Sequence, residues 1–497
     1  MKLSPSFPRV LLRLSILVSL TLLCSCATSL KEVPVENVVM VDEYSRLLDP
    51  TGNTACVEPT GPRGLCRGNH DGGTNYRPLA EPYRTNYIDT LLKSVSERPE
   101  GKRRLLIFVH GGLNTQKTSV KRAVKLAPEV DQAGYYPLFI NWRSSLVNSY
   151  FDHLFFVRQG EEMKYLGPLT SPFTFVYDIG RAVLRAPLVW SSQIYGGVQA
   201  LPGAPLPNDL KGRQDFLLDD QKAHPGKAIS ILPGEDMRSE GEKQMAAISW
   251  VVWQPIRFLV AAPLTDGFGT SAWDTMQRRT QLLFHTMEEY EKNHPPEPKG
   301  DLYVVMKKLE DVLRSQGQWD VVLVGHSMGT IVLNEMLRQF PDFPASTIIY
   351  MAAACSVRDF EQSVIPYLRR HNQTTFYNLT LQRRAEEGER WEPFHIPYVD
   401  WAMRGSLLVW IDEFFSNPLT PENKTLGRYV NFLRNEQLLF PSELRGRIYQ
   451  KEFRYGDSVS KTDPQKHGDF DRCPFWKKEF YSLEHASQDP KLFCSED

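Results

Sequence analysis

The sequence predicts an α/β fold, in which short buried strands alternate with helices. The first observation is the stretch VVLVGHSMGTIVL, residues 321–333, where a Val-rich strand of the kind buried in parallel sheets leads through a glycine-flanked turn into an apolar helical pattern. The second is KRRLLIFVHGGLNT, residues 102–115, a buried strand that ends in two glycines. The third is a helical pattern over residues 118–134, after which the chain enters another strand, YYPLFINW.

Composition excludes several classes of partner. The chain has 497 residues, of which 41% are hydrophobic, so it can bury a large core. Its 58 basic side chains nearly balance its 59 acidic ones, which argues against a nucleic-acid surface. We find no internal repeat, phosphate loop, dinucleotide fingerprint or metal-binding Cys-x-x-Cys or His-x-x-x-His spacing. The sequence therefore predicts no metal and no cofactor.

The N-terminus has the features of an export signal. Basic residues precede the apolar run LSILVSLTLL, and LCSC comes directly after it. This stretch resembles the lipobox of bacterial lipoproteins, which implies that residues 1–25 are a signal peptide and that Cys26 receives the lipid. Cys24 fits worse because bulky Leu23 precedes it; an uncleaved anchor helix is the alternative. By the sorting pattern of such lipoproteins, Ala27 implies the outer membrane, facing the periplasm.

Export changes how the other cysteines are interpreted. In an oxidising compartment, two cysteines in a Pro/Gly-rich loop and two near the C-terminus could each form a disulfide. We therefore expect the pairs Cys56–Cys66 and Cys473–Cys494, with Cys355 left as a free thiol.

The turn around Ser327 is a candidate nucleophile site. Gly325 and Gly329 flank Ser327 at the spacing of a sharp strand-to-helix turn, where missing Cβ atoms let the backbone fold back and expose the hydroxyl. A serine in a merely structural turn is the alternative. The preceding strand and the following helix favour the nucleophile.

A candidate oxyanion hole accompanies it. Gly111 and Gly112 directly follow a strand, where main-chain N–H groups can point into a cavity. The second donor would be the N–H of Met328, at the start of the helix after Ser327, where the helix dipole favours negative charge.

Together these motifs resemble the α/β-hydrolase superfamily, over roughly residues 86–482. The resemblance implies a mostly parallel sheet wrapped by helices, Ser327 as nucleophile, and catalytic residues in the chain order serine, acid, histidine. It divides the chain into a lead-in, a core in two segments and an inserted cap or lid. These parts are residues 26–85, residues 86–143 with 265–497, and residues 144–264.

The histidine is expected in a loop after the last strand of the sheet, for which GRIYQKEFRY is the candidate. His467 lies in such a loop and is the first choice. The alternatives are His485, where a helix is expected to end, and His395 and His371.

The acid should follow the strand TTFYNLTLQ, and Glu386 is the first choice. Glu387, Asp400 and Asp412 are the alternatives. The charged stretch around Glu386 could also be a solvated loop.

Within residues 144–264, two segments are strongly apolar, residues 171–197 and 245–264. Internal charges and a proline argue against membrane spans, so we expect interfacial helices or the core of a cap. The polar stretch 203–227 is predicted to be a loop. Ser271 and Asp274 have the spacing of a capping box and predict the start of a helix over residues 270–284.

The sequence thus predicts a membrane-anchored serine esterase or lipase that cleaves acyl esters through an acyl-enzyme. An acyltransferase with the same residues and a non-catalytic binding lipoprotein are the alternatives. The expected partners are an acyl-ester or lipid substrate and the membrane that holds the lipid on Cys26. Acyl chain length and oligomeric state are not indicated.

Overall fold

The computed structural model describes most of the chain after the N-terminal segment. The described residues are 33–42, 45–51, 76, 78–158, 161–162, 166–200, 206–284, 300–391, 404–416, 420–484 and 493–495. Cys26, Cys56, Cys66, His395, Asp400 and His485 lie outside them.

An eight-stranded sheet in the order β1-β3-β2-β7-β8-β9-β10-β6 forms the centre, and every neighbouring pair is parallel. The predicted α/β fold is therefore confirmed. The strands are β1 (Val38–Met40), β2 (Arg104–Val109), β3 (Tyr136–Asn141), β6 (Ser230–Leu232), β7 (Asp320–His326), β8 (Thr347–Met351), β9 (Thr375–Thr380) and β10 (Ile448–Glu452). Two short antiparallel strands, β4 (Val157–Arg158) and β5 (Glu161–Glu162), form a separate hairpin that is not part of this sheet.

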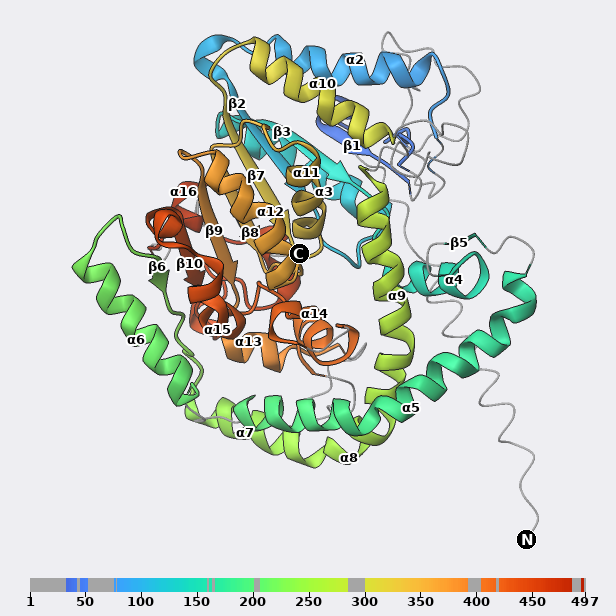
Figure 1. Ribbon diagram of the computed structural model, residues 1–497, viewed down its shortest axis with the longest axis vertical. Helices are drawn as coiled ribbons and strands as arrows, with labels where there is room; N and C mark the ends of the chain where they lie inside the picture. Colours follow the sequence, from blue (N-terminus) through green and yellow to red (C-terminus); the bar gives the residue numbers. More distant parts are fainter. Residues whose placement is uncertain are drawn as a thin grey trace.

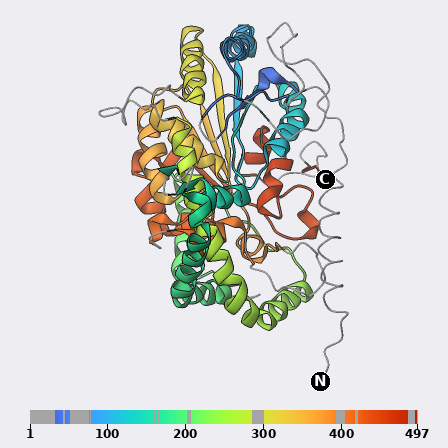
Figure 2. The same ribbon diagram turned by 90° about the vertical axis from the view of Figure 1, so that its right-hand side faces the viewer.

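Helices cover both faces of the sheet, with α10 to α12 on one face and α3 and α16 on the other (Figures 1 and 2). This arrangement buries the central strands on both sides, which is why they are almost continuously apolar. The helices around the sheet are α2 (Tyr83–Ser96), α3 (Gln116–Gln132), α10 (Asp301–Ser315), α11 (Gly329–Gln339), α12 (Val357–Arg370), α13 (Arg383–Gly388), α14 (Leu407–Trp410), α15 (Tyr429–Leu439) and α16 (Lys478–Tyr481).

The chain reverses its direction of travel through the sheet between β2 and β7. From β2 it continues outward to β3, whereas from β7 it continues the other way through β8, β9 and β10. Val109 pairs with Gly325, so the loops after β2 and β7 leave the same edge side by side. In open parallel sheets, such a reversal at the carboxyl edge is where ligands bind.

Residues 144–264 are mainly helical, and α5, α7 and α8 lie along one end of the molecule (Figure 1), whereas β6 joins the central sheet beside β10. In this part, α5 packs against α9, and the indole N–H of Trp190 donates to the main-chain oxygen of Phe258. The helices are α4 (Leu146–Phe155), α5 (Gly167–Ala200), α6 (Asn208–Ala223), α7 (Glu240–Val252), α8 (Gln254–Ile256), the π-helix η3 (Arg257–Ala261) and α9 (Ala262–Leu282), which runs on into the core.

Two predictions for this part were wrong. The stretch 203–227, expected to be a loop, contains α6, because Leu210 and Leu217 fall on one face and are buried despite polar surroundings. Ser271 does not cap a helix: α9 is unbroken from Ala262, and the Ser271 hydroxyl donates to the Asp178 carboxylate at 2.9 Å instead.

Exposed apolar side chains concentrate on these helices. Among the described residues, all large exposed hydrophobic side chains except Leu282 and Leu438 lie between residues 147 and 264. The run Glu240–Leu282 is also long and apolar enough to cross a membrane, and only 17% of its most apolar window is buried. A concentration of exposed apolar side chains on one group of helices is typical of an interaction surface.

Candidate active site

Ser327 occupies a strained turn at the carboxyl end of β7. Its φ is 52°, a left-handed conformation that a non-glycine residue adopts only when its surroundings enforce it. Hydrogen bonds hold it there: its N–H donates to the Met351 oxygen at 2.9 Å, and its own oxygen accepts the Ala354 N–H at 3.1 Å.

The flanking glycines are required by close packing. A Cβ atom at Gly329 would lie 2.1 Å from the Val109 oxygen, and one at Gly325 would lie 3.1 Å from the Cα of Thr330. The spacing in the sequence thus reflects the close approach of α11 to β2 and β7.

His467 meets Ser327 from the opposite end of the chain. Its Nε2 atom lies 2.8 Å from Ser327 Oγ, and both residues are buried. His467 begins the 3₁₀ helix η9 (His467–Arg472), in the loop after β10 where the sequence placed it. The structure therefore brings together the serine and the histidine chosen from the sequence.

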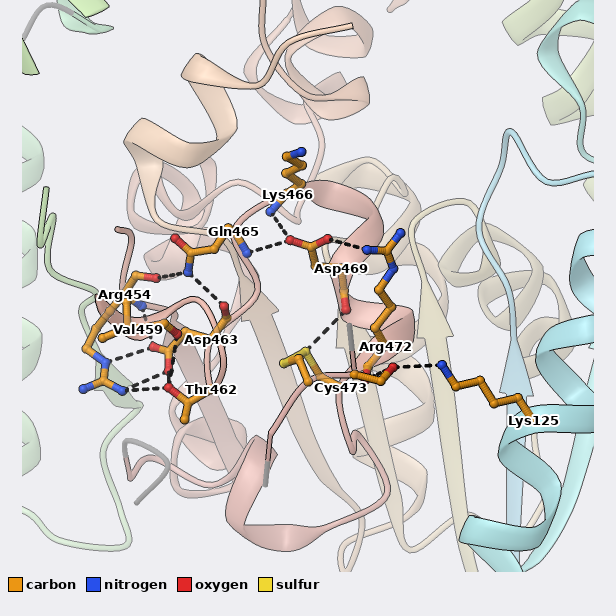
Figure 3. Close-up of a disulfide and its surroundings, with 12 residues drawn as sticks. Lys125, Arg454, Val459, Thr462, Asp463, Gln465, Lys466, Asp469, Arg472 and Cys473 are labelled. Carbon is orange, nitrogen blue, oxygen red and sulfur yellow. Dashed lines mark hydrogen bonds and ion pairs between the residues drawn. A yellow bond between two sulfur atoms is a disulfide. The ribbon is translucent and has the colours of Figure 1, made fainter. Parts of the chain in front are cut away.

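The loop that carries His467 is cross-braced. Arg454 forms an ion pair with Asp463 at 2.9 Å, and the Asp469 carboxylate accepts the Lys466 N–H at 2.8 Å (Figure 3). At the end of η9, Cys473 forms a disulfide with Cys494, as predicted. Cys355 is buried and free.

A second histidine holds the main chain of the first. His326, between Gly325 and Ser327, donates from Nε2 to the His467 oxygen at 3.0 Å. Its Nδ1 lies 2.9 Å from Asp471 Oδ1, and Asp471 is paired with Arg122 of α3 at 2.7 Å. Burial alone would raise the pKa of Asp471, but Arg122 and His326 together lower it well below its usual range.

Gly112 and Met328, the two residues expected to form the oxyanion hole, lie close together beside the turn. A Cβ atom at Gly112 would lie 2.8 Å from the Met328 sulfur, so the two residues chosen for the oxyanion hole are in contact range. None of the hydrogen bonds between described residues uses the N–H of Gly112 or of Met328 as donor. Neither N–H group therefore has an acceptor among the described residues.

No match to this chain was found among family models, curated proteins or solved structures.

The structure does not place the predicted acid, Glu386, against His467. Glu386 is buried on α13, where it accepts a hydrogen bond from the Ser406 hydroxyl. Burial raises its pKa to about 8, although Ser406 partly opposes the shift, so this carboxyl is protonated at neutral pH. The expected hydrogen bond between Glu386 and His467 is thus not found, because position after β9 does not determine where a side chain points.

The alternatives are also engaged elsewhere. Asp412 accepts from the Thr425 N–H and pairs with Arg428, and Glu387 also lies near Arg428. Among the alternative histidines, His371 lies directly after the C-terminal end of α12, where its ring stacks on Tyr367.

Sequence reasoning missed two carboxylates that do approach His467. Glu389, three residues after Glu386, accepts the main-chain N–H of His467 at 3.0 Å. Asp471 lies in the same short helix as His467 and contacts His326, which in turn holds the main chain of His467. His467 Nδ1 is buried with no hydrogen-bond partner among the described residues. The only available signal was that His326 and Asp471 lay inside the motifs already selected.

Electrostatics leave His467 uncharged. Burial is the main cause that lowers its pKa to about 3; His326 contributes to the shift, and Asp471 partly opposes it. A neutral imidazole accepts a proton from a hydroxyl, which is the chemistry required of a general base. Within the described residues, no group of three or more His, Cys, Asp or Glu side chains could hold a metal ion.

Proposed function

We propose that this protein is a serine hydrolase of the α/β-hydrolase type that cleaves ester bonds through an acyl-enzyme. The observation that carries the proposal is the 2.8 Å contact between Ser327 Oγ and His467 Nε2 on a left-handed turn. A nucleophile hydrogen-bonded to a neutral base, close to two main-chain N–H groups that have no acceptor among the described residues, fits what acyl transfer needs.

In the first half-reaction, Ser327 Oγ attacks the ester carbonyl carbon while His467 Nε2 takes the hydroxyl proton. The N–H groups of Gly112 and Met328 donate to the oxyanion that forms. The bond between the carbonyl carbon and the alcohol oxygen then breaks, and His467 returns the proton to the departing alcohol. In the second half-reaction, water attacks the acyl group with the same help, which releases the acid and restores Ser327.

Two groups would keep His467 in place during these steps. His326 holds its carbonyl oxygen and Glu389 holds its N–H, each at 3.0 Å. Asp471 supplies negative charge near the imidazolium that forms transiently, since it raises the pKa of His467 against the effect of burial.

Labelling with a fluorescent fluorophosphonate, which reacts covalently with activated serines, tests the proposal. The full-length protein in mild detergent is labelled, and the modified residue is mapped by peptide mass spectrometry. Labelling at Ser327 that disappears in His467→Ala supports the proposal. A folded protein that takes up no label would refute it and favour a binding role.

We further propose that the protein is anchored to the bacterial outer membrane by a lipid on Cys26. The exposed apolar side chains of α5 and of the run from α7 to α9 would lie against that membrane. A Cys26→Ser protein mixed with phospholipid vesicles tests the second part by flotation. Glutamate substitutions at the exposed residues Leu184 and Leu259 should release the protein from the vesicles. A Cys26→Ser protein that never floats would contradict the interfacial role.

A further inference from the structure

A cavity of about 820 Å³ lies between the helices of residues 144–264 and the core. Its walls come from α4, α5, α9 and η5 (Ile411–Phe415), and from the segment after β8. The volume is in the range of sites that bind small molecules.

This cavity shares a wall with the candidate active site. Ala354 lines the cavity, and its N–H donates to the main-chain oxygen of Ser327 at 3.1 Å. Trp273 of α9 lines it as well, and Met276, one turn further along α9, lies against the Gly112 position. A molecule in the cavity would therefore contact a wall that is hydrogen-bonded to the nucleophile turn, although Ser327 and His467 do not themselves line the cavity.

The walls are charged, unlike those of a channel for acyl chains. Three arginines line the cavity, and Arg278 is paired with Asp274 at 2.9 Å. Within the part of the chain that the structure describes, Arg158 donates only to neutral oxygens, those of Thr170 and of the main chain at His153, Leu154 and Gly167.

Arg181 has the weakest contacts of the three. Among the described residues, its only hydrogen bond reaches the Ser271 hydroxyl at 3.4 Å, and its buried Nε has no partner. A guanidinium has five N–H donors, and in a partly buried position most of them need a hydrogen-bond acceptor, which Arg181 does not find among the described residues.

The acidic wall residue nearest to Arg181 in sequence already has its own donors. Asp178 accepts from Tyr150 at 3.2 Å, contacts His153 Nε2 at 3.1 Å and accepts from Ser271 at 2.9 Å. The positive charges of Arg158 and Arg181 thus have no carboxylate contact among the described residues.

We infer that this cavity binds an anionic group, a carboxylate or phosphate, carried by the ester substrate, and that Arg181 is the residue that selects it. Guanidinium groups bind both anions with charge-assisted, paired hydrogen bonds. The inference rests on the proposed hydrolase function and specifies its substrate class: esters that carry an anionic group, in place of neutral lipid esters.

The test compares two soluble esters of similar size, 4-nitrophenyl butyrate and mono-4-nitrophenyl succinate. The full-length protein is expected to prefer the anionic ester in kcat/KM by about tenfold or more, the effect of one charge-assisted hydrogen bond. Arg181→Gln should abolish the preference, whereas Arg181→Lys should keep part of it. Lys222→Gln on α6, where the side chain is 76% exposed, removes one charge outside the cavity and should leave the preference unchanged.

A binding measurement separates this inference from the hydrolase proposal. Glutarate or dispersed phosphatidylglycerol should slow fluorophosphonate labelling of Ser327 in the wild type, and not in Arg181→Gln. Protection by glutarate would identify a soluble anionic ester, and protection by the lipid alone an anionic headgroup. Labelling that neither compound slows, or a preference that survives in a folded Arg181→Gln protein, would overturn the inference. Failure of all labelling would instead refute the hydrolase.

Discussion

His467 Nε2 and Ser327 Oγ lie 2.8 Å apart, although 140 positions separate the two residues in the chain. The sheet explains how they meet. Ser327 follows β7, and the loop after β10 brings His467 back over the same carboxyl edge. Because His467 is buried and uncharged, the contact can transfer a proton from serine to histidine.

Removing either partner should abolish ester hydrolysis. We expect Ser327→Ala and His467→Ala each to lower kcat/KM for 4-nitrophenyl butyrate by at least about a thousandfold, with the double variant no worse than either. His371→Ala is the matched control, because this histidine stacks on Tyr367 outside the site and should leave activity unchanged. An active Ser327→Ala protein would end the proposal.

His326 is predicted to position His467. His326→Ala removes the donor to the His467 oxygen and should lower kcat by about tenfold to a hundredfold with KM little changed, since small displacements of a catalytic group are costly. His326→Gln, whose amide can still donate to that oxygen, should recover part of the rate. Equal losses in both variants would show that His326 serves only to pack the turn.

Much of this site could be predicted from the sequence because turns constrain residue type locally. Gly329 is required by contact with the Val109 oxygen, and such requirements leave a visible spacing around Ser327. His467 could be placed because it follows the last strand in the chain. The strands beside it were recognisable for a similar reason, since burial on both faces makes them continuously apolar.

The acid could not be predicted, because its role depends on side-chain direction. Glu386, Glu387 and Glu389 occupy one short stretch, yet they contact Ser406, Arg428 and the His467 main chain respectively. Likewise, α6 was not predicted because only two of its residues, Leu210 and Leu217, are buried. Two apolar positions among polar residues give too weak a helical pattern.

The pH dependence of labelling should show that His467 is neutral. With a pKa of about 3 in the folded protein, the fraction of neutral imidazole stays close to one down to pH 5. We expect the fluorophosphonate labelling rate to fall by less than about twofold between pH 7.5 and pH 5. A rate that halves near pH 6.5, the ordinary value for histidine, would contradict a desolvated base.

The disulfides predict the number of free thiols. Cys473–Cys494 closes the segment next to η9, and Cys56–Cys66 remains a prediction outside the described residues. With Cys26 lipidated, unreduced and unfolded protein should react with about one equivalent of thiol reagent, at Cys355. Cys494→Ser should lower the free energy of unfolding by ~2–4 kcal/mol. Three or more thiols in the wild type would refute the pairing.

Glu386 is predicted to make stability fall as pH rises. Its folded pKa of about 8 lies above the value of 4.5 for an ordinary glutamate, so its contribution to stability is complete below pH 4.5 and is lost as pH rises through 8. Glu386→Gln keeps the acceptor for Ser406 without a charge. One pKa unit corresponds to ~1.4 kcal/mol. We therefore expect the difference in free energy of unfolding between Glu386→Gln and the wild type to shift in favour of the variant by at least ~1 kcal/mol from pH 5 to pH 8.5. Denaturant unfolding at both pH values measures the gain, and Glu443→Gln, at an exposed ion pair, is the control.

If Glu386→Gln loses stability at pH 8.5 as the wild type does, Glu386 is not the buried, protonated group inferred from its surroundings. Esterase activity is measured on the same variant. An active Glu386→Gln protein would exclude Glu386 as the catalytic acid, whatever the result for stability.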